Sequence, residues 1–197
     1  MNRQLVAAPA LEPVTVTELA RNLRLLLAPN QNYDGAEVDL LATLIKAARE
    51  DVESYTQRDY ALKTYSEAFA SLAAQLPLER SVTEVVSVEY LDASDTGQTV
   101  APTDYYTVTV KERGCIEFKP SFIYPDLANH PEAVKVIYRS GFSDASLVPQ
   151  TIKQSIVLIA SHWYENREAA SVTGIEIKEV PLAYRWLLDA HRLPALG

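Results

Sequence analysis

Two residues three positions apart, His162 and Glu165, have the spacing of metal ligands on one face of a helix. Carboxylate-bridged metal sites use such pairs, but they repeat the pattern on facing helices. The chain has 3 histidines in all, and His130 and His191 stand in unrelated contexts. A polar edge on an otherwise apolar helix is therefore the better interpretation, and we expect no metal and no cofactor.

Nucleophilic catalysis finds no support in the motifs of the chain. The single cysteine, Cys115, lies beside Ile116 in a strand-like run, where a thiol is usually buried and inert. The sequence contains no nucleophile elbow, H-E-x-x-H helix, P-loop or dinucleotide-binding fingerprint. Its 6 glycines do not cluster into a loop that could hold a phosphate. We expect no catalytic residues and no enzyme activity.

Helical patterns occupy both ends of the chain. Thr15 and Glu18 have the spacing of a capping box, and Asp34 with Glu37 marks a second helix start. That second helix has an apolar face at positions 38, 41, 45, 48, 52 and 55, and a parallel row at Leu40, Leu44 and Ala47. A single helical hairpin covers only part of this surface. The second row must therefore meet other segments or another subunit.

The C-terminal helices carry many aromatic side chains. Pro149 suits the first turn of a helix that should continue to about residue 170, and a last helix should start at Pro181. The aromatic residues that flank these helices are Trp163, Tyr164, Tyr184 and Trp186. Such side chains bury a large area and keep a polar group, which suits both packing between helices and contact between subunits. Both interpretations stay open.

The middle of the chain changes to a period of two. Runs rich in β-branched and aromatic residues predict short strands at 82–90, 105–110, 115–118 and 133–138, with a tight hairpin at 111–114. Short strands joined by hairpins favour an antiparallel sheet. The predicted fold class is α+β, a helical bundle formed by the N- and C-terminal helices with an inserted antiparallel β subdomain. The expected parts are an N-terminal extension (1–13), N-terminal helices (14–58), the β subdomain (59–147), and C-terminal helices with a tail (148–197).

Composition excludes several classes of protein. With 197 residues, 48% apolar and 22% charged, the chain is long enough for one domain with a proper core. Its net charge of −8 argues against a general nucleic-acid-binding protein, which would display a basic face. No apolar run reaches the length of a membrane span, and the N-terminus does not resemble a signal peptide. We expect a protein made in a reducing cytoplasm.

Six stretches of the sequence, distributed over residues 13–192, form a recognisable pattern by their residues and their order. They are PVTVTELA (13–20), EVDLLATLIKAAREDVESYTQR (37–58), DYY (104–106), VIYRSGF (136–142), VPQTIKQSIVLIASHWYENRE (148–168), and PLA with LL (181–183 and 187–188). In wording and order they resemble the head–tail connector proteins, also called adaptor or head-completion proteins, of long-tailed bacteriophages and gene transfer agents.

This resemblance implies a structural virion protein, assembled in the bacterial host cytoplasm and located at the head–tail interface. The chain would form a ring, commonly a dodecamer, under the portal protein. The ring would extend the DNA channel and dock a tail-side connector or tail terminator protein. DNA would pass without specific binding, and an acidic channel wall would repel phosphate. Acidity that serves only solubility is an equally good explanation of the charge.

Two sets of residues are candidates for protein contacts. The second apolar row of the long helix, Leu40, Leu44 and Ala47, is the expected subunit interface. The resemblance implies that the C-terminal part engages the portal, and the expected contacts are Tyr184, Arg185, Trp186 and Arg192. Arginine suits interface ion pairs, although a solvated helix face also explains both arginines. An alternative function is a small non-enzymatic adaptor that binds a protein partner outside a virion.

Overall fold

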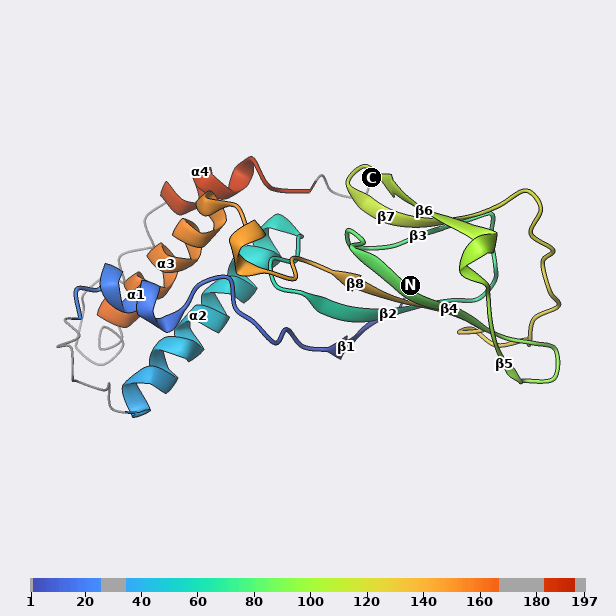
Figure 1. Ribbon diagram of the computed structural model, residues 1–197, viewed down its shortest axis with the longest axis horizontal. Helices are drawn as coiled ribbons and strands as arrows, with labels where there is room; N and C mark the ends of the chain where they lie inside the picture. The colour runs from blue at the N-terminus through green and yellow to red at the C-terminus, as the bar shows by residue number, and fades with distance from the viewer. Residues whose placement is uncertain (1, 26–34, 167–182, 194–197) are drawn as a thin grey trace, which may run out of the picture. The chain divides into compact units, whose positions relative to one another are not determined.

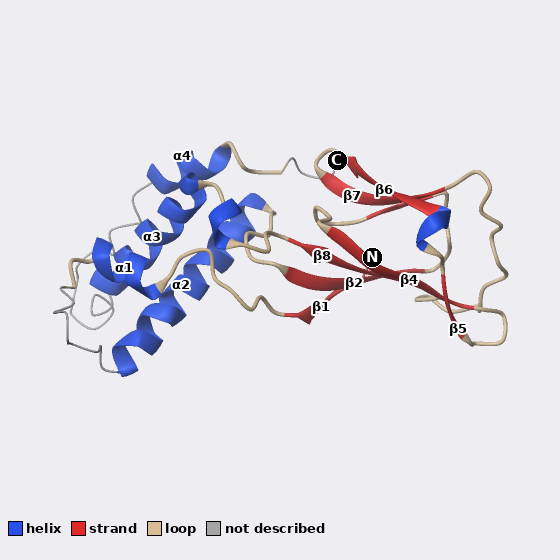
Figure 2. Ribbon diagram, in the orientation of Figure 1, coloured by secondary structure: helices blue, strands red, loops and turns tan. Residues whose placement is uncertain are grey.

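The computed structural model describes residues 2–25, 35–166 and 183–193, and these form both helices and antiparallel sheets, so the chain has an α+β fold as predicted. The chain divides into two compact units. A helical unit comprises described residues of Leu11–Tyr60 and Asp144–Leu193. A β unit comprises described residues of Met1–Ala10 and Ala61–Ser143 (Figure 2).

The helical unit begins with a capped helix. Its α-helices are α1 (Val16–Asn22), α2 (Gly35–Thr56), α3 (Gln150–Glu165) and α4 (Ala183–Asp189), preceded in the second segment by the short 3-10 helix η2 (Ala145–Leu147). The Thr15 hydroxyl accepts from the Glu18 N–H at 3.2 Å, and the Glu18 carboxylate accepts from the Thr15 N–H at 2.7 Å. This is the predicted capping box. The predicted cap at Asp34 and the predicted helix start at Pro181 lie outside the described residues.

The core of the helical unit lies mainly between α2 and α3. Helix α2 contacts α1, α3 and α4, and α3 also contacts α1 and α4. The side chains that are 1% exposed or less at the centre are Leu41, Ile45, Ala48 and Val52 of α2 and Ile152, Ile156, Ile159 and Ala160 of α3. They follow the helical spacing of both sequence patterns, so burial of apolar area sets the rotation of each helix.

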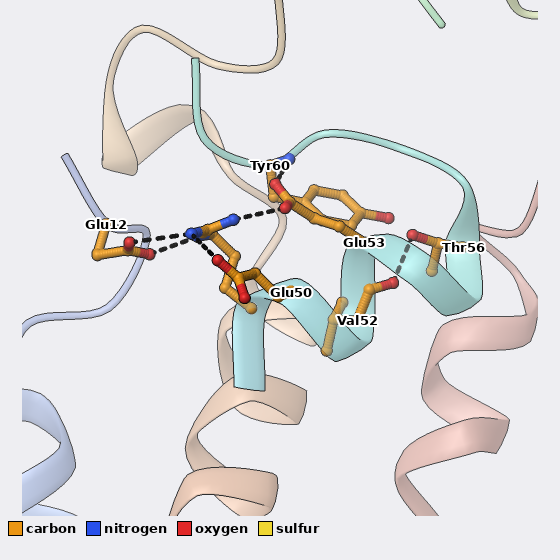
Figure 3. A network of polar contacts seen from close by, with 7 residues as sticks. Glu12, Glu50, Val52, Glu53, Thr56 and Tyr60 are labelled. Atoms are coloured by element: carbon orange, nitrogen blue, oxygen red, sulfur yellow. Dashed lines mark hydrogen bonds and ion pairs between the residues drawn. The ribbon is translucent and has the colours of Figure 1, made fainter. Parts of the chain in front are cut away.

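A charged residue extends this buried face of α2. Arg49 is 1% exposed, and its guanidinium donates to both carboxylate oxygens of Glu12, at 2.6 Å and 3.2 Å, and to Glu53 at 2.6 Å (Figure 3). The second oxygen of Glu53 accepts from the Tyr60 N–H at 2.8 Å. Glu50 adds a longer contact of 3.5 Å from an exposed position. One guanidinium thus joins the segment before α1 to α2 and, through Glu53, to the end of the segment that follows α2.

Burial and charge act against each other at Arg49. Burial disfavours the charged guanidinium, but the hydrogen bond to Glu12 and the charge of Glu53 outweigh it and raise the pKa of Arg49. The guanidinium therefore stays charged, and the two carboxylates next to it stay compensated. Removal of one partner of a buried ion pair leaves an uncompensated charge in the interior, which costs more than the pair itself contributes.

We predict that Arg49→Ala lowers the free energy of unfolding by about 3–5 kcal/mol, because Glu53 would lose its charge partner in the interior. Glu50→Gln is the matched control, since Glu50 is 57% exposed and should cost less than about 1 kcal/mol. Urea unfolding followed by circular dichroism measures both. Equal stabilities of Arg49→Ala and Glu50→Gln would contradict the role of this network.

The β unit contains two antiparallel sheets rather than the single sheet expected. One sheet has the strand order β1 (Asn2–Ala7), β2 (Lys63–Phe69), β8 (Val134–Ser140), β4 (Glu84–Leu91) and β5 (Gly97–Thr99). The other has the order β3 (Gln75–Pro77), β7 (Arg113–Phe118) and β6 (Tyr105–Val110), and β6 follows the 3-10 helix η1 (Pro102–Asp104) (Figure 1). Strands β4, β6, β7 and β8 were predicted. The residues expected as an N-terminal extension include β1, which pairs with β2.

Side chains from both sheets form one apolar core. The large sheet contributes Tyr65, Val88, Val134, Val136 and Tyr138, and the small sheet contributes Leu76, Tyr105, Ile116 and Phe118. Along β8 the buried residues alternate with residues that are exposed or half-buried, as the period-two pattern predicts.

Two turns of the β unit need unusual backbone angles. The predicted hairpin between β6 and β7 turns at Lys111 and Glu112, whose φ angles are 49° and 65°. Positive φ at both central residues is the requirement of a type I′ hairpin turn. After β8, Gly141 has a φ of 100°, and a Cβ atom there would collide with the carbonyl of Ala61. The close approach of these two backbone segments explains the glycine.

The β unit also contains a buried carboxylate, Glu67 of β2, which is fully buried. It accepts hydrogen bonds from the Tyr138 hydroxyl and from the Glu79 N–H, the latter at 3.0 Å. Arg3 of β1 pairs with the Glu79 carboxylate at 2.9 Å. Burial raises the pKa of Glu67 despite these hydrogen bonds. The protonated form of Glu67 is therefore favoured more in the folded chain than in the unfolded chain.

This shift makes stability depend on pH. A carboxyl group with a raised folded-state pKa contributes stability below its unfolded pKa of about 4.3 and loses it as pH rises through the folded value. We predict that Glu67→Gln, which removes the titrating group, gains stability relative to the natural chain as pH rises from the unfolded pKa of about 4.3 towards neutrality. Urea midpoints of both proteins across that range measure the difference. A stability difference that does not change with pH would contradict a raised pKa at Glu67.

Candidate interaction surfaces

The second row of α2 lies at the margin of the helical core. Leu40, Leu44 and Ala47 are all half-buried, whereas Leu41 and Ile45 one position further on are 0% and 1% exposed. The rotation of α2 therefore turns this row partly outward, next to the exposed face of the helix. A half-buried apolar row can take a partner without a change in the fold of the chain.

The C-terminal helix α4 presents an exposed tryptophan. Trp186 is 79% exposed, whereas Tyr184 and Leu188 of the same helix are 8% and 0% exposed. Tyr184 and Leu188 thus hold α4 against the helical unit while Trp186 faces away from it. A large aromatic side chain with this exposure is the type of residue that dominates binding energy in protein interfaces. Of the four expected portal contacts, Tyr184 is the one that the chain itself buries.

Both arginines of this region lie over tyrosine rings. Arg185 lies 6.0 Å from the ring centroid of Tyr184, and Arg192 lies 5.3 Å from that of Tyr55. The Tyr55 hydroxyl donates to Asp189 at 2.6 Å, and this hydrogen bond raises the pKa of Tyr55. Both guanidinium groups are nevertheless exposed. They are thus oriented by aromatic contacts and remain accessible to a partner.

Two hydrogen bonds fix the chain after α4, one between backbone groups and one from the side chain of Arg58. The Leu193 N–H donates to the carbonyl of Thr56 at 2.9 Å, and Arg58 donates to the carbonyl of His191 at 2.7 Å. Thr56 is the last residue of α2, and Arg58 lies two residues after it. The surface around Trp186 is therefore built on a fixed support.

The other aromatic candidates pack within the chain. Trp163 and Tyr164 of α3 are half-buried, and the Tyr164 hydroxyl donates to Glu37 of α2 at 2.5 Å. This hydrogen bond supports the interpretation that Tyr164 connects the helices, one of the two that the sequence left open.

The residues considered for catalysis or metal binding do not come together. His162 is half-buried and lies next to Asn166, with 3.3 Å between ring and amide nitrogens, while Glu165 is exposed. In the described part of the chain, no group of three or more histidine, cysteine, aspartate or glutamate side chains could hold a metal ion. Cys115 is buried, and burial raises the pKa of its thiol. Among the described helices, none has the length and apolar character needed to cross a bilayer.

Sequence patterns missed the exposed apolar residues on two strands of the β unit, β1 and β6. Leu5 and Val6 of β1 are 55% and 58% exposed, and Tyr106 and Val110 of β6 are 54% and 50% exposed. The alternation along 105–110 predicted the strand. It could not indicate that β6 is the outermost strand of its sheet, because strand order is not local in sequence.

Comparison with known proteins gives matches among solved structures only. No family model matches the chain, and no curated protein matches it. The chain is similar to a chain from the neck of an empty gene transfer agent particle computed with C6 symmetry, with a TM-score of 0.78, 21% identity, and coverage of 100% of this chain and 98% of that chain. A chain from the virion of a native gene transfer agent particle gives a TM-score of 0.76 at 21% identity and the same coverage.

A third structure, the neck of a native gene transfer agent particle computed with C12 symmetry, gives a TM-score of 0.70 at 19% identity, again over 100% of this chain and 98% of that chain. All three likenesses extend over both units of the chain. The chain therefore shares its fold with chains in structures of gene transfer agent particles, and two of these structures are of the neck.

Proposed function

We propose that the chain is a structural head–tail connector (adaptor) in the neck of a tailed phage or gene transfer agent particle. The observation that carries the proposal is the likeness to particle chains over 100% of this chain. The six sequence stretches that resemble head–tail connectors support the same function independently. In this proposal the chain works through assembly, and no residue has a catalytic role.

The proposed assembly is a ring of twelve copies under the portal protein. The similar neck structures were computed with C6 and with C12 symmetry. A closed ring of twelve identical subunits satisfies both symmetries, since a sixfold axis is contained in a twelvefold one. Cyclic rings need a heterologous interface, in which two different surfaces of the subunit meet. The half-buried row of Leu40, Leu44 and Ala47 is proposed as one of these surfaces.

The proposed contact with the portal is the exposed side of α4. Trp186 would be its centre, with Arg185 and Arg192 beside it and Tyr184 beneath them as support. A desolvated tryptophan flanked by arginines has the composition of an interface hot spot. In this arrangement the helices from both chain ends form a bundle that faces the portal. A tail-side connector or tail terminator protein is the proposed partner on the tail side of the ring.

Charge suits a subunit that surrounds DNA. The chain carries −8, and a ring multiplies this charge around a channel. Such a wall repels the phosphate backbone, so that the duplex passes without specific binding. The location of the protein would be the head–tail interface of the virion, after assembly in the bacterial host cytoplasm.

The second candidate is a small non-enzymatic adaptor that binds one protein partner outside any virion. The exposed Trp186 alone would serve that function equally well. The two candidates differ in the oligomeric state that they require, because an adaptor of this kind needs no ring.

We predict that Leu44→Asp leaves the chain folded but prevents its entry into rings, because a charge would be placed in a desolvated subunit contact. Ala42→Asp is the matched control, since Ala42 lies on the exposed face of the same helix and should assemble normally. Sedimentation velocity and circular dichroism on the same samples separate assembly from folding. A Leu44→Asp chain that unfolds would assign the row to the core and contradict the proposed interface.

A further inference from the structure

Strand β6 is an edge strand of the small sheet as far as the structure describes the chain. Among the described residues, β7 is the only strand that pairs with β6. The six residues of β6, Tyr-Tyr-Thr-Val-Thr-Val, include no charged residue, no proline and no glycine. Natural edge strands usually carry charges, prolines or bulges, or are very short, because an unprotected edge pairs with other strands. None of these protective features is present in β6.

The hydrogen bonds of β7 identify which backbone groups of β6 face outward. The N–H of Gly114 in β7 donates to the carbonyl of Arg80, and the carbonyl of Gly114 accepts from the N–H of Leu78. Both partners lie on the β3 side of β7. In an antiparallel ladder each residue directs its N–H and C=O to the same side, and the side alternates along the strand. Residue 115 of β7 therefore bonds to β6, where its partner is Val108. The N–H and C=O groups of Thr107 and Thr109 consequently face away from the sheet.

The remaining sheet edges differ in length. Strands β3 and β5 have three residues each, and β3 contains Pro77. Strand β1 has six residues, as β6 does, and it forms the outer edge of the large sheet. The pairing of β1 with β2 is regular over Asn2–Leu5 and shifts between Leu5 and Ala7. The regular part of β1 and the whole of β6 are thus the two long edges in the part of the chain that the structure describes.

We propose that β6 of one copy pairs with β1 of the next copy, so that the small sheet of one subunit continues into the large sheet of its neighbour. This inference rests on the proposed ring and identifies a contact within it. Because β6 and β1 are different strands, each copy would pair through β6 with one neighbour and through β1 with the other. A closed ring requires such a contact between two different surfaces. Figure 1 draws β1 and β6 on opposite sides of the β unit. A pairing of β6 with itself would instead give a twofold dimer.

Side chains of the two strands support the pairing. On each strand two apolar side chains are at least half exposed: Leu5 and Val6 on β1, and Tyr106 and Val110 on β6. The new contact would cover apolar surface on both sides. The charged residue of β1, Arg3, already pairs with Glu79 at 2.9 Å, and β6 carries no charge. Two acidic copies can therefore approach along these strands without like charges opposite each other.

The test uses a proline at an outward-facing position. Thr107→Pro removes an N–H that faces away from β7 and bonds to no other described residue, so the β6–β7 ladder should persist and the chain should stay folded. It should raise the protein concentration needed for assembly about tenfold or more, because the intersubunit ladder loses a donor and meets the proline ring. Thr107→Ala, which keeps the N–H, is the matched control and should assemble like the natural chain. Equal assembly of both variants would overturn the proposal.

A cross-linking experiment decides the matter even if the proline variant does not fold. In a Cys115→Ala background, Gln4→Cys and Thr107→Cys are made singly and together, and concentrated protein is treated with a short bismaleimide. The double variant should give a ladder of dimers, trimers and larger species, and the single variants should give none. A dimer from Thr107→Cys alone, or no ladder from the double variant, would overturn the strand pairing. Electron microscopy of the natural chain in the same buffer reports separately whether rings form, so a failed pairing and a failed function are distinguishable.

Discussion

The buried guanidinium of Arg49 is the interaction on which the arrangement of the helical unit depends. It connects Glu12, which lies before α1, with Glu53 on α2, and Glu53 in turn holds the backbone of Tyr60. A buried charge tolerates little displacement, because its desolvation is offset only while both carboxylates remain in place. Arg49 and Glu53 extend the apolar face of α2, so their ion pairs can form only at the rotation of the helix that burial of its apolar face already sets. The outward tilt of Leu44 and its row follows from that rotation.

Much of the fold could be predicted because its signals are local. The capping box at Thr15, the helical periodicities and the hairpin at residues 111–114 depend only on nearby residues, and the structure confirms them. Strand β2 was missed because its inward-facing residues include the carboxylate of Glu67. That residue can be buried only because Tyr138 and the Glu79 backbone hydrogen-bond to it. Likewise, nothing near Arg49 indicates that its partner lies 37 positions earlier.

The candidate surfaces also comprise some that local sequence patterns predict and some that depend on residues far apart in the sequence. Periodicity identified the second row of α2, and the aromatic content of the C-terminal region led to α4, but sequence could not tell which side chains the chain buries. Within α4, Tyr184 supports the helix and Trp186 is exposed. The open edge of β6 could not be predicted, because it results from strand order across two sheets. A chain with the proposed connector function would have to keep several such surfaces accessible before assembly and cover them only in the ring. Its acidity would then let repulsion between copies delay that step.

The central claim, assembly into a closed ring, is tested most directly by the mass of the purified natural chain across a series of salt and protein concentrations. Each chain carries −8, and screening shortens the range of repulsion to about 8 Å at physiological ionic strength. We therefore expect a single large species with the mass of twelve chains, whose share rises with salt. A chain that remains a monomer or dimer at every salt and protein concentration, with and without portal protein, would contradict the account.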